Sequence, residues 1–311
     1  MTAPIAVTRS GGKLRAFWEL GKPRLSALAV FAVVAGAWMG WPAKTSHPPI
    51  DLLLATTLGT FLCAIGSGAL NMYRERHLDP LMKRTQGRPL PTGRLSPREV
   101  LVFGVTACIV GVLCVLLGAA PLAGDGSRTP GTWNWTAAFL CASIVGSYVA
   151  VYTPMKTKTP LNTLVGAIPG ALPPVVGHAA VTGVLAMPQA VLFAIVFCWQ
   201  IPHFLSIAWR YRDDYAKAGM QMLPVVDPTG YRTAITMLLY VGGLGIASLI
   251  PYYTQMAGPR YAAVAVLLDI MFVVPTVFAA LTRRDTAMRM TFVTSIVYLP
   301  VLLTAMVWDK G

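Results

Sequence analysis

The chain has 311 residues, of which 55% are hydrophobic and only 12% are charged, and its mean hydropathy is +0.61. Soluble domains carry roughly 25% charged residues, so an ordinary soluble enzyme is excluded, and a disordered chain would need far lower hydrophobicity. The composition is that of an integral membrane protein with several helices. The net charge of +13 would suit nucleic acid only if the basic residues shared one soluble face.

Nine apolar stretches are long enough to cross a bilayer, because a spanning helix needs about 20 mostly apolar residues. The fifth stretch is interrupted by Gly and Pro, and such breaks at membrane depth are tolerated where neighbouring helices or a cavity satisfy the backbone. We therefore expect an all-α integral membrane protein with nine transmembrane helices around a central cavity, lined in part by the fifth helix. The expected spans are residues 24–42, 51–72, 99–120, 133–152, 162–184, 187–208, 231–253, 260–281 and 289–308.

Lysine and arginine gather on one side of these spans. Of the 25 such residues, 21 fall in the N-terminal arm or in the loops after spans two, four, six and eight; the others are Lys44, Arg128, Arg260 and Lys310. Cytoplasmic loops collect Lys and Arg, so we expect the N-terminus in the cytoplasm and the C-terminus outside. The net charge then reflects topology and gives no support to a nucleic-acid partner.

We expect a single nine-helix domain at residues 24–308 after a cytoplasmic arm at residues 1–23, with polar loops at about 73–98 and 209–230. Ala35-Gly36-Ala37 mimics a signal-peptidase site, but cleavage there would remove the Lys22-Pro23-Arg24 turn, so we expect the segment to be kept. The absence of a recognisable transit peptide favours a bacterial plasma membrane over a mitochondrion. The cysteines fall inside spans without a CxxC pair, so neither disulfides nor a thiolate metal site are expected: Cys63, Cys108, Cys114, Cys141 and Cys198.

The loop after the second span carries a stripe of oxygen donors. Asn71, Glu75 and Asp79 are spaced four apart, so on a helix they share one face. Two carboxylates and an amide can hold Mg²⁺, which is usually bound by one or two carboxylates and substrate phosphates. Arg84 and Arg88 follow one turn apart and could grip phosphate oxygens. The alternative is an interfacial helix crossed by ion pairs.

A second loop with carboxylates beside cations follows the sixth span, on the same expected side. It contains Asp213 and Asp214 with Arg212 and Tyr215, and because adjacent side chains point apart on a helix, only one aspartate is expected to reach a metal. Two acidic loops facing each other would repel unless cations intervened, and a Mg²⁺–diphosphate would bridge them. This pattern indicates an enzyme acting on a lipid diphosphate, with a metal as Lewis acid and a water-poor cavity for an allylic cation.

The first loop, Asn71-x₃-Glu75-x₃-Asp79-x₂-Met82-x-Arg84-Thr85-x₂-Arg88-Pro89, resembles the first Asp-rich motif of the UbiA-type intramembrane prenyltransferases. Its Met-x-Arg-Thr-x-x-Arg-Pro tail is similar to the haem O synthase (protoheme IX farnesyltransferase) branch of that superfamily. Three further matches follow in order over roughly residues 20–310. They are Lys22-Pro23-Arg24, the segment from Tyr152-Thr153 to Asn162, and Pro202-His203-Phe204 continuing to Arg212-Asp213-Asp214-Tyr215.

The resemblance implies transfer of the farnesyl group of farnesyl diphosphate to a vinyl group of haem B, with addition of water, to give haem O for terminal oxidases. It implies Mg²⁺ as cofactor and a possible downstream haem A synthase as partner. Carried over position by position, it assigns three sets of residues. The catalytic motifs consist of Asn71, Glu75, Asp79, Asp213 and Asp214, and the four carboxylates of this set hold Mg²⁺. The residues that contact diphosphate are Arg84, Arg88, Lys156, Arg212 and Tyr215.

Two positions depart from the family pattern. Glu75 stands where many members of the superfamily have Asp, and the longer carboxylate can still bind Mg²⁺. His178 stands where a bulky apolar residue is expected; it is a weaker haem-binding candidate than His203, which lies in the family's Pro-His-Phe. For each histidine the alternative is a hydrogen-bonded structural residue.

Two further polar residues have open roles. An intramembrane carboxylate such as Asp269 is a functional candidate by default, unless it is simply hydrogen-bonded or protonated. Asn162 would cap the fifth span or touch diphosphate.

Three other functions compete with haem farnesylation. The first is a prenyltransferase of the same fold acting on an aromatic quinone precursor. The second is a non-catalytic haem-handling membrane protein, which would not need carboxylates on two loops. The third is a transporter with broken helices, whose substrate site should lie near the bilayer midplane. The charged groups here gather at one surface instead.

Overall fold

The structure is a computed structural model that describes residues 12–42, 50–118, 121–122, 127 and 132–311, with only the backbone given for residues 23–25. The described chain is helical throughout, apart from loops and one isolated antiparallel bridge between Ala257 and Lys310. Lys44, Arg128 and the Arg24 side chain lie outside the described residues.

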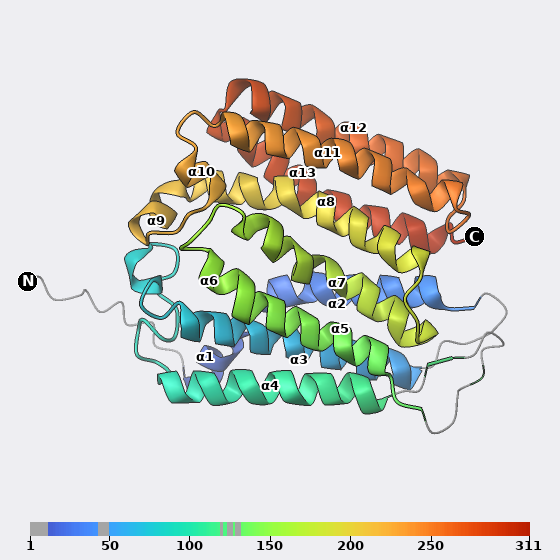
Figure 1. Ribbon diagram of the computed structural model, residues 1–311, viewed down its shortest axis with the longest axis horizontal. Helices are drawn as coiled ribbons and strands as arrows, with labels where there is room; N and C mark the ends of the chain where they lie inside the picture. The colour runs from blue at the N-terminus through green and yellow to red at the C-terminus, as the bar shows by residue number, and fades with distance from the viewer. Residues whose placement is uncertain (1–11, 43–49, 119–120, 123–126, 128–131) are drawn as a thin grey trace, which may run out of the picture.

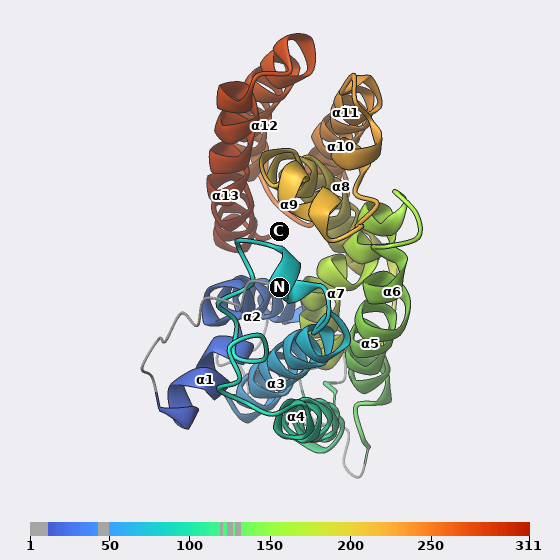
Figure 2. The ribbon, with the colours of Figure 1, turned by 90° about the vertical axis from the view of Figure 1, so that its left-hand side faces the viewer.

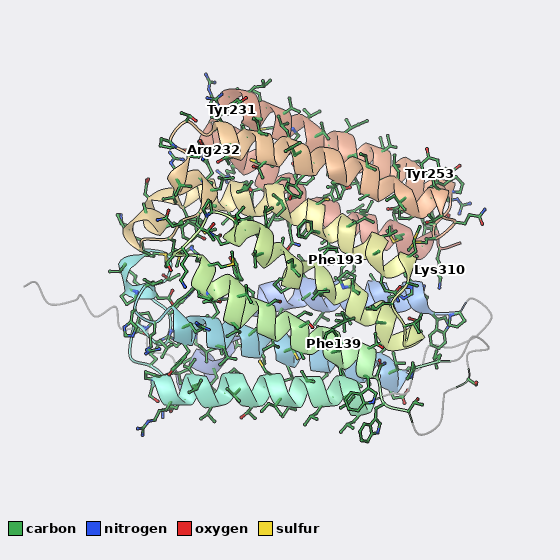
Figure 3. All side chains as sticks on the ribbon, viewed as in Figure 1. Phe139, Phe193, Tyr231, Arg232, Tyr253 and Lys310 are labelled. Atoms are coloured by element: carbon green, nitrogen blue, oxygen red, sulfur yellow. The ribbon has the colours of Figure 1, made fainter. Side chains whose placement is uncertain are left out.

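Long helices lie side by side along the longest axis of the molecule (Figure 1). One end carries residues 75–96, the loop after α3, and residues 211–222, which follow α8; we call it the motif end. Figure 3 places Arg232 at this end and Tyr253 and Lys310 at the opposite end. The helices are α1 (Lys13–Leu20), α2 (Pro23–Gly40), α3 (Ile50–Arg74), α4 (Pro97–Gly118), α5 (Trp135–Gly146), α6 (Thr153–Met155), α7 (Asn162–Thr182), α8 (Met187–Arg210), α9 (Arg212–Lys217), α10 (Leu223–Val226), α11 (Tyr231–Tyr253), α12 (Pro259–Thr282) and α13 (Asp285–Trp308).

Eight helical stretches among the described residues are long and apolar enough to cross a membrane, where the sequence predicts nine. The first predicted span, residues 24–42, is the one not among the eight; it corresponds to α2, whose apolar part, Ser26–Gly40, is shorter than the others. The fourth span is not uniform. After α5 the chain continues as a π-helix over Ser147–Tyr152 and then as α6, so one membrane crossing combines α-helical and π-helical segments.

The Pro- and Gly-rich fifth span forms one continuous helix, α7, although Pro169, Pro173 and Pro174 lie inside it. It is the most enclosed of the eight spans, with 72% of its most apolar window buried. Its small residues permit a very close crossing with α2: a Cβ added at Gly177 would lie 1.9 Å from the Val33 carbonyl oxygen. Proline kinks are tolerated where neighbouring helices surround the backbone, which is the position of α7.

Asp269 has a structural explanation inside the helices near the C-terminus. The Tyr298 hydroxyl donates to Asp269 Oδ1 (2.6 Å) and the Ser248 hydroxyl donates to Oδ2 (2.7 Å). These bonds connect α11, α12 and α13, and they satisfy a carboxyl group that would otherwise be costly in an apolar environment. All five cysteines are free, as expected.

Candidate active site

The polar stripe that follows α3 continues beyond the end of the regular helix. The Glu75 amide donates to the Asn71 carbonyl (2.9 Å), and the Asp79 amide donates to the Glu75 carbonyl (2.9 Å). These bonds to the fourth preceding residue keep the three side chains on one face, as their spacing predicts. All three are buried, with Asp79 fully enclosed. Pro80 then falls in a short 3₁₀ turn, Asp79–Leu81, where the helical path ends.

Lys156 joins Asn71 to Glu75 from the turn between α6 and α7. Its Nζ donates to Glu75 Oε1 (2.5 Å) and to Asn71 Oδ1 (3.1 Å). Asn71 Nδ2 donates to Glu75 Oε2 (2.8 Å), and the Thr153 hydroxyl donates to Asn71 Oδ1 (3.0 Å). Every polar atom of the Asn71 amide and the Glu75 carboxylate therefore has a partner, and a buried ion pair is stabilised when such bonds surround it.

Arg88 holds the second carboxylate of the stripe. One of its terminal nitrogens, Nη1, donates to both oxygens of Asp79 (2.7 and 2.8 Å) and lies 3.9 Å from Glu75 Oε2. The two carboxylates therefore converge on one guanidinium nitrogen. The Thr85 hydroxyl donates to the Asp79 carbonyl (2.8 Å), which fixes the turn that carries Arg88. The expected basic tail thus folds back onto the acidic stripe.

Burial and nearby charge act in opposite directions on these carboxyl groups. Burial raises the pKa of Glu75, but Lys156, Lys22 and Arg88 together outweigh it and leave that pKa below its usual value. At Asp79 burial prevails over Arg88, and the pKa of the carboxyl is raised. Burial lowers the pKa of Lys156, but negative neighbours including Glu75 prevail and raise it. The Glu75–Lys156 pair is therefore ionised at neutral pH.

Lys22 is a further cation of this cluster that the site prediction missed. It precedes α2 in a left-handed conformation (φ 43°), which is uncommon for a residue other than glycine. Burial, together with the positive charges of Arg88 and Lys156, lowers the pKa of Lys22 to about 7, while Glu75 acts in the opposite direction. The Lys22-Pro23-Arg24 turn was the available sequence signal, but the sequence does not show where the lysine side chain lies.

Two tyrosines of the π-helical segment were also missed. The Lys156 ammonium lies 4.6 Å from the ring centre of Tyr152, and the rings of Tyr148 and Tyr152 are 5.3 Å apart. The Thr153 hydroxyl also donates to the Tyr148 carbonyl (2.8 Å). The extra residue per turn of the π-helix thereby brings aromatic faces and a hydroxyl to the Asn71 side of the site, a pattern that apolar periodicity does not indicate.

The second loop meets the first through Arg84. The Arg84 amide donates to Asp214 Oδ2 (3.2 Å), and its guanidinium donates to the Tyr215 hydroxyl (3.2 Å). Viewed from the motif end, α9 and the loop after α3 approach each other over the middle of the bundle (Figure 2). Asp213 is exposed, whereas Arg212 points to Asp285, with Nη1 3.3 Å from its Oδ1. The structure thus brings Arg84, Asp214 and Tyr215 together and leaves Asp213 and Arg212 outside this contact.

The oxygen donors of the stripe after α3 have the chemistry that a hard cation requires. Asn71, Glu75 and Asp79 offer only oxygen acceptors and an amide, the ligands that Mg²⁺ prefers. In the described part of the chain, however, no three His, Cys, Asp or Glu side chains lie close enough to hold a metal by themselves. Lys156 and Arg88 neutralise the two carboxylates instead. These oxygen ligands become available to a metal when an anion that binds together with it, such as a diphosphate, takes over the ion pairs of Lys156 and Arg88.

His203 lies between α8 and α13 and contacts a serine of α13. Its Nδ1 lies 2.7 Å from the Ser295 hydroxyl oxygen, and that hydroxyl donates its one proton to the Phe292 carbonyl (2.6 Å). The Ser295 oxygen is then able to accept from Nδ1–H of His203, and this tautomer leaves a lone pair on Nε2. The ring lies between Trp199 (5.1 Å) and Phe292 (5.2 Å) and is partly accessible.

His178 and Asn162 occupy different environments. His178 lies in α7 toward the opposite end of the bundle, buried against Gly40 of α2, and its Nδ1 has no hydrogen-bond partner. Asn162 begins α7 but does not cap it: its amide donates to the carbonyls of Thr159 (2.6 Å) and Gln221 (2.9 Å). Asn162 thereby connects the Lys156 turn to the second loop.

Comparison with known families identifies the class. Residues 29–301 match the UbiA prenyltransferase family, so the chain belongs to that family and is a multi-pass membrane enzyme. Among curated relatives, a protoheme IX farnesyltransferase of Solibacter usitatus is 42% identical, with 96% of this chain and 99% of the relative covered. Those of Nitrosomonas eutropha and Aquifex aeolicus are 36% and 34% identical, covering 99% and 95% of this chain and 98% and 95% of theirs.

Solved structures support the same fold. A digeranylgeranylglyceryl phosphate synthase superposes with a TM-score of 0.75 at 16% identity, covering 96% of this chain and 98% of the other. A UbiA homologue of Archaeoglobus fulgidus bound to DMAPP and Mg²⁺ gives a TM-score of 0.61 at 15% identity, covering 96% and 99%. At these identities the likeness establishes the helical architecture alone.

Proposed function

We propose that this enzyme transfers the farnesyl group of farnesyl diphosphate to a vinyl group of haem B, with addition of water, and releases haem O and diphosphate. The observation that carries the proposal is the enclosed cluster of Asn71, Glu75 and Asp79 with Lys156 and Arg88 at the motif end. Relatives of this chain at 34–42% identity and near-complete coverage are named for this activity. A quinone-precursor acceptor has no comparable support among these relatives.

The acidic residues of the site would bind the metal, and the basic residues would bind the diphosphate. Asn71, Glu75 and Asp79, with Asp214 from the facing loop, would hold Mg²⁺, which supplies a Lewis acid for the leaving diphosphate. Lys156 and Arg88 now bind the carboxylates, and a diphosphate would compete for them as a more highly charged acceptor. Arg84 would contact the diphosphate from the point where the loops meet. We also keep Arg212, Tyr215 and Asp213 as candidates, with Asp213 and Arg212 the weaker ones.

The bond changes balance without an oxidant. The bond between farnesyl carbon 1 and the diphosphate oxygen breaks, and its electron pair leaves on diphosphate. The vinyl group donates its π electrons to carbon 1, and water adds to the resulting cation and loses a proton. The apolar interior around α7 and α8 keeps bulk water from the allylic carbon, which such a cation requires.

We assign the haem contact to Nε2 of His203. Metal-binding imidazoles commonly donate their other N–H to a neighbouring oxygen, and the Ser295 hydroxyl oxygen, 2.7 Å from Nδ1, is placed to receive that N–H here. His203 is seven residues from the motif end of α8, or about 10 Å along the axis, whereas His178 is sixteen residues from the motif end of α7, or about 24 Å. A haem at His203 can therefore present a vinyl group near the diphosphate site. His178 is the weaker candidate.

The membrane arrangement is also a proposal. We infer nine spans with α2 included, the motif end in the cytoplasm, the C-terminus outside, and a bacterial plasma membrane, because the basic residues favour that orientation. Haem O would then be available to a haem A synthase acting downstream.

The test incubates the purified protein with haem B, farnesyl diphosphate and Mg²⁺, followed by mass spectrometry of the extracted haems. We expect a haem heavier by one farnesyl group and one water, which is absent with EDTA and absent for Asp79→Asn. Unchanged haem, together with consumption of farnesyl diphosphate when a quinone precursor is supplied, would refute the haem acceptor. Loss of the haem B absorbance shift in His203→Ala but not in His178→Ala would support the assigned ligand.

A further inference from the structure

An apolar groove runs along the outside of the bundle, between α1, α3 and α4, away from the proposed active site. Its larger part has a volume of about 650 Å³ and its smaller part about 270 Å³. Phe17 of α1 and Phe103 of α4 line both parts, with their rings 5.2 Å apart. Ile65 of α3 forms the floor of both. The lining is almost entirely apolar except at one end.

The charged end of the groove lies at the motif end, where α4 begins. Arg98 and Glu99 line the groove there. Lys13 donates to Glu99 Oε1 (2.9 Å), so that carboxylate is neutralised. Arg98 is exposed, and none of the described carboxylates pairs with it. The groove therefore combines one available cation with an apolar channel.

Helix α1 has the character of an interfacial helix. Leu14 and Trp18 are 88% and 63% exposed on one side of it, while Lys13 and Arg15 carry its positive charge. Helices with an apolar face and basic flanks lie in the headgroup region of a membrane. Along α4, exposed apolar side chains such as Val102, Val105 and Ile109 face outward. The groove thus opens toward lipid and not toward the motif loops.

We propose that this groove binds one phospholipid of the leaflet at the motif end, with its phosphate at Arg98 and one acyl chain along α4. The dimensions agree with this occupant. Arg98 and Val110 mark the two ends of the groove on α4; their separation of twelve residue steps spans about 18 Å along the helix. Half the hydrocarbon thickness of a bilayer is about 15 Å. A single acyl chain thus fits from the headgroup level to the middle of the membrane.

The groove is connected to the polar cluster by the chain itself. α1 ends at Leu20, and Lys22, two residues later, belongs to that cluster. Glu19 in the same turn accepts from Arg94 (2.6 Å), which lies in the loop after α3. A lipid held under Phe17 therefore fixes the segment that positions Lys22. The binding site itself does not depend on the proposed haem chemistry.

The test titrates the purified full-length chain in detergent with palmitoyl-oleoyl phosphatidylglycerol and with the matching diacylglycerol, and counts bound molecules by native mass spectrometry. We expect one phosphatidylglycerol per chain, bound about tenfold more tightly than diacylglycerol, because its phosphate makes a charge-assisted bond to Arg98; tenfold corresponds to about 1.4 kcal/mol. Arg98→Gln should remove that preference. Arg232→Gln, which changes another exposed arginine at the motif end, should not.

A pair of groove variants separates binding from folding. Val102→Trp fills the groove from an exposed position and should lower lipid affinity at least tenfold. Val105→Trp, three residues along the same helix and outside the lining, should bind lipid like the parent. Equal binding by the two variants, or equal affinity for the two lipids, would overturn the proposal. Displacement of the lipid by farnesyl diphosphate would also overturn it and make the groove an entry site for substrate.

Discussion

At the scale of single residues, the proposed active site is a balance of buried charges. Glu75 meets Lys156, Asp79 meets Arg88, and Lys22 adds a positive charge with no hydrogen-bonded carboxylate among the described residues. Breaking one side of a buried pair leaves an uncompensated charge, whereas neutralising both sides does not. The pairs therefore allow stability and activity to be measured separately.

We predict that Lys156→Met loses prenyl transfer and lowers the free energy of unfolding by roughly 3 kcal/mol, because Glu75 is then buried without its cation. The double variant Glu75→Gln with Lys156→Met should recover most of that stability but no activity, since the diphosphate contact stays absent. Thermal unfolding in detergent and haem mass spectrometry measure the two effects. Recovery of activity in the double variant would show that Lys156 acts only as a counterion.

The protonation of Lys22 gives a pH prediction. Since the pKa of Lys22 is about 7, the side chain is charged below pH 7 and loses its proton as the pH rises above it. The charged groups that act on it are Arg88, Lys156, Glu75 and Arg84. The charged form attracts diphosphate, so the affinity for inorganic diphosphate should fall as the pH rises through 7.

Calorimetric titration of inorganic diphosphate from pH 6 to pH 9 measures this effect. Lys22→Arg keeps its charge throughout that range, so the fall in affinity above pH 7 should disappear in this variant. A fall of the same size in Lys22→Arg would assign the titration to another group.

At the scale of elements, the site depends on two loops that are remote in sequence. The loop after α3 and helix α9 meet where Arg84 contacts Asp214 and Tyr215. Each loop is fixed by its own turns, and Asn162 connects the second one to the start of α7 through Gln221. The contact therefore positions one acidic residue of the second loop, and the adjacent one remains at the surface.

We predict that Asp214→Asn lowers kcat/KM at least tenfold, whereas Asp213→Asn changes it less than threefold. The two variants remove the same charge from neighbouring positions, so a general electrostatic effect would be equal in both. Only Asp214 lies at the Arg84 contact and can face the first loop. Steady-state kinetics at saturating Mg²⁺ distinguishes them, and equal losses would mean that the second loop rearranges when substrate binds.

At the scale of the whole molecule, the sequence predicts the helices better than it predicts their side-chain partners. The eight long apolar spans are predictable from the sequence, because each span must contain enough apolar residues to match the thickness of the bilayer. The Asn71–Glu75–Asp79 stripe follows from helical spacing. The partner of Glu75 does not, because Lys156 lies 81 residues away and reaches it through the fold. The π-helical turn and the left-handed Lys22 depend on packing that apolar periodicity does not encode.

The number of spans determines where the ends of the molecule lie. If α2 crosses the membrane together with the eight longer spans, the motif end and the far ends of α11 and α13 are on opposite sides. Thr157 is exposed in the turn after α6 and Tyr253 is 77% exposed at the far end of α11. Cysteines placed at these two positions would report the two surfaces, and the native cysteines all lie within helices.

We predict that in intact bacterial cells a membrane-impermeant maleimide labels Tyr253→Cys and leaves Thr157→Cys unlabelled. In inverted membrane vesicles the pattern should reverse. The native chain serves as the background control in both preparations, because its cysteines all lie within long apolar helices. Labelling of Thr157→Cys in intact cells would place the diphosphate site on the outer surface. It would also contradict the positive-inside rule, because the sequence predicts 21 of the 25 basic residues on that side.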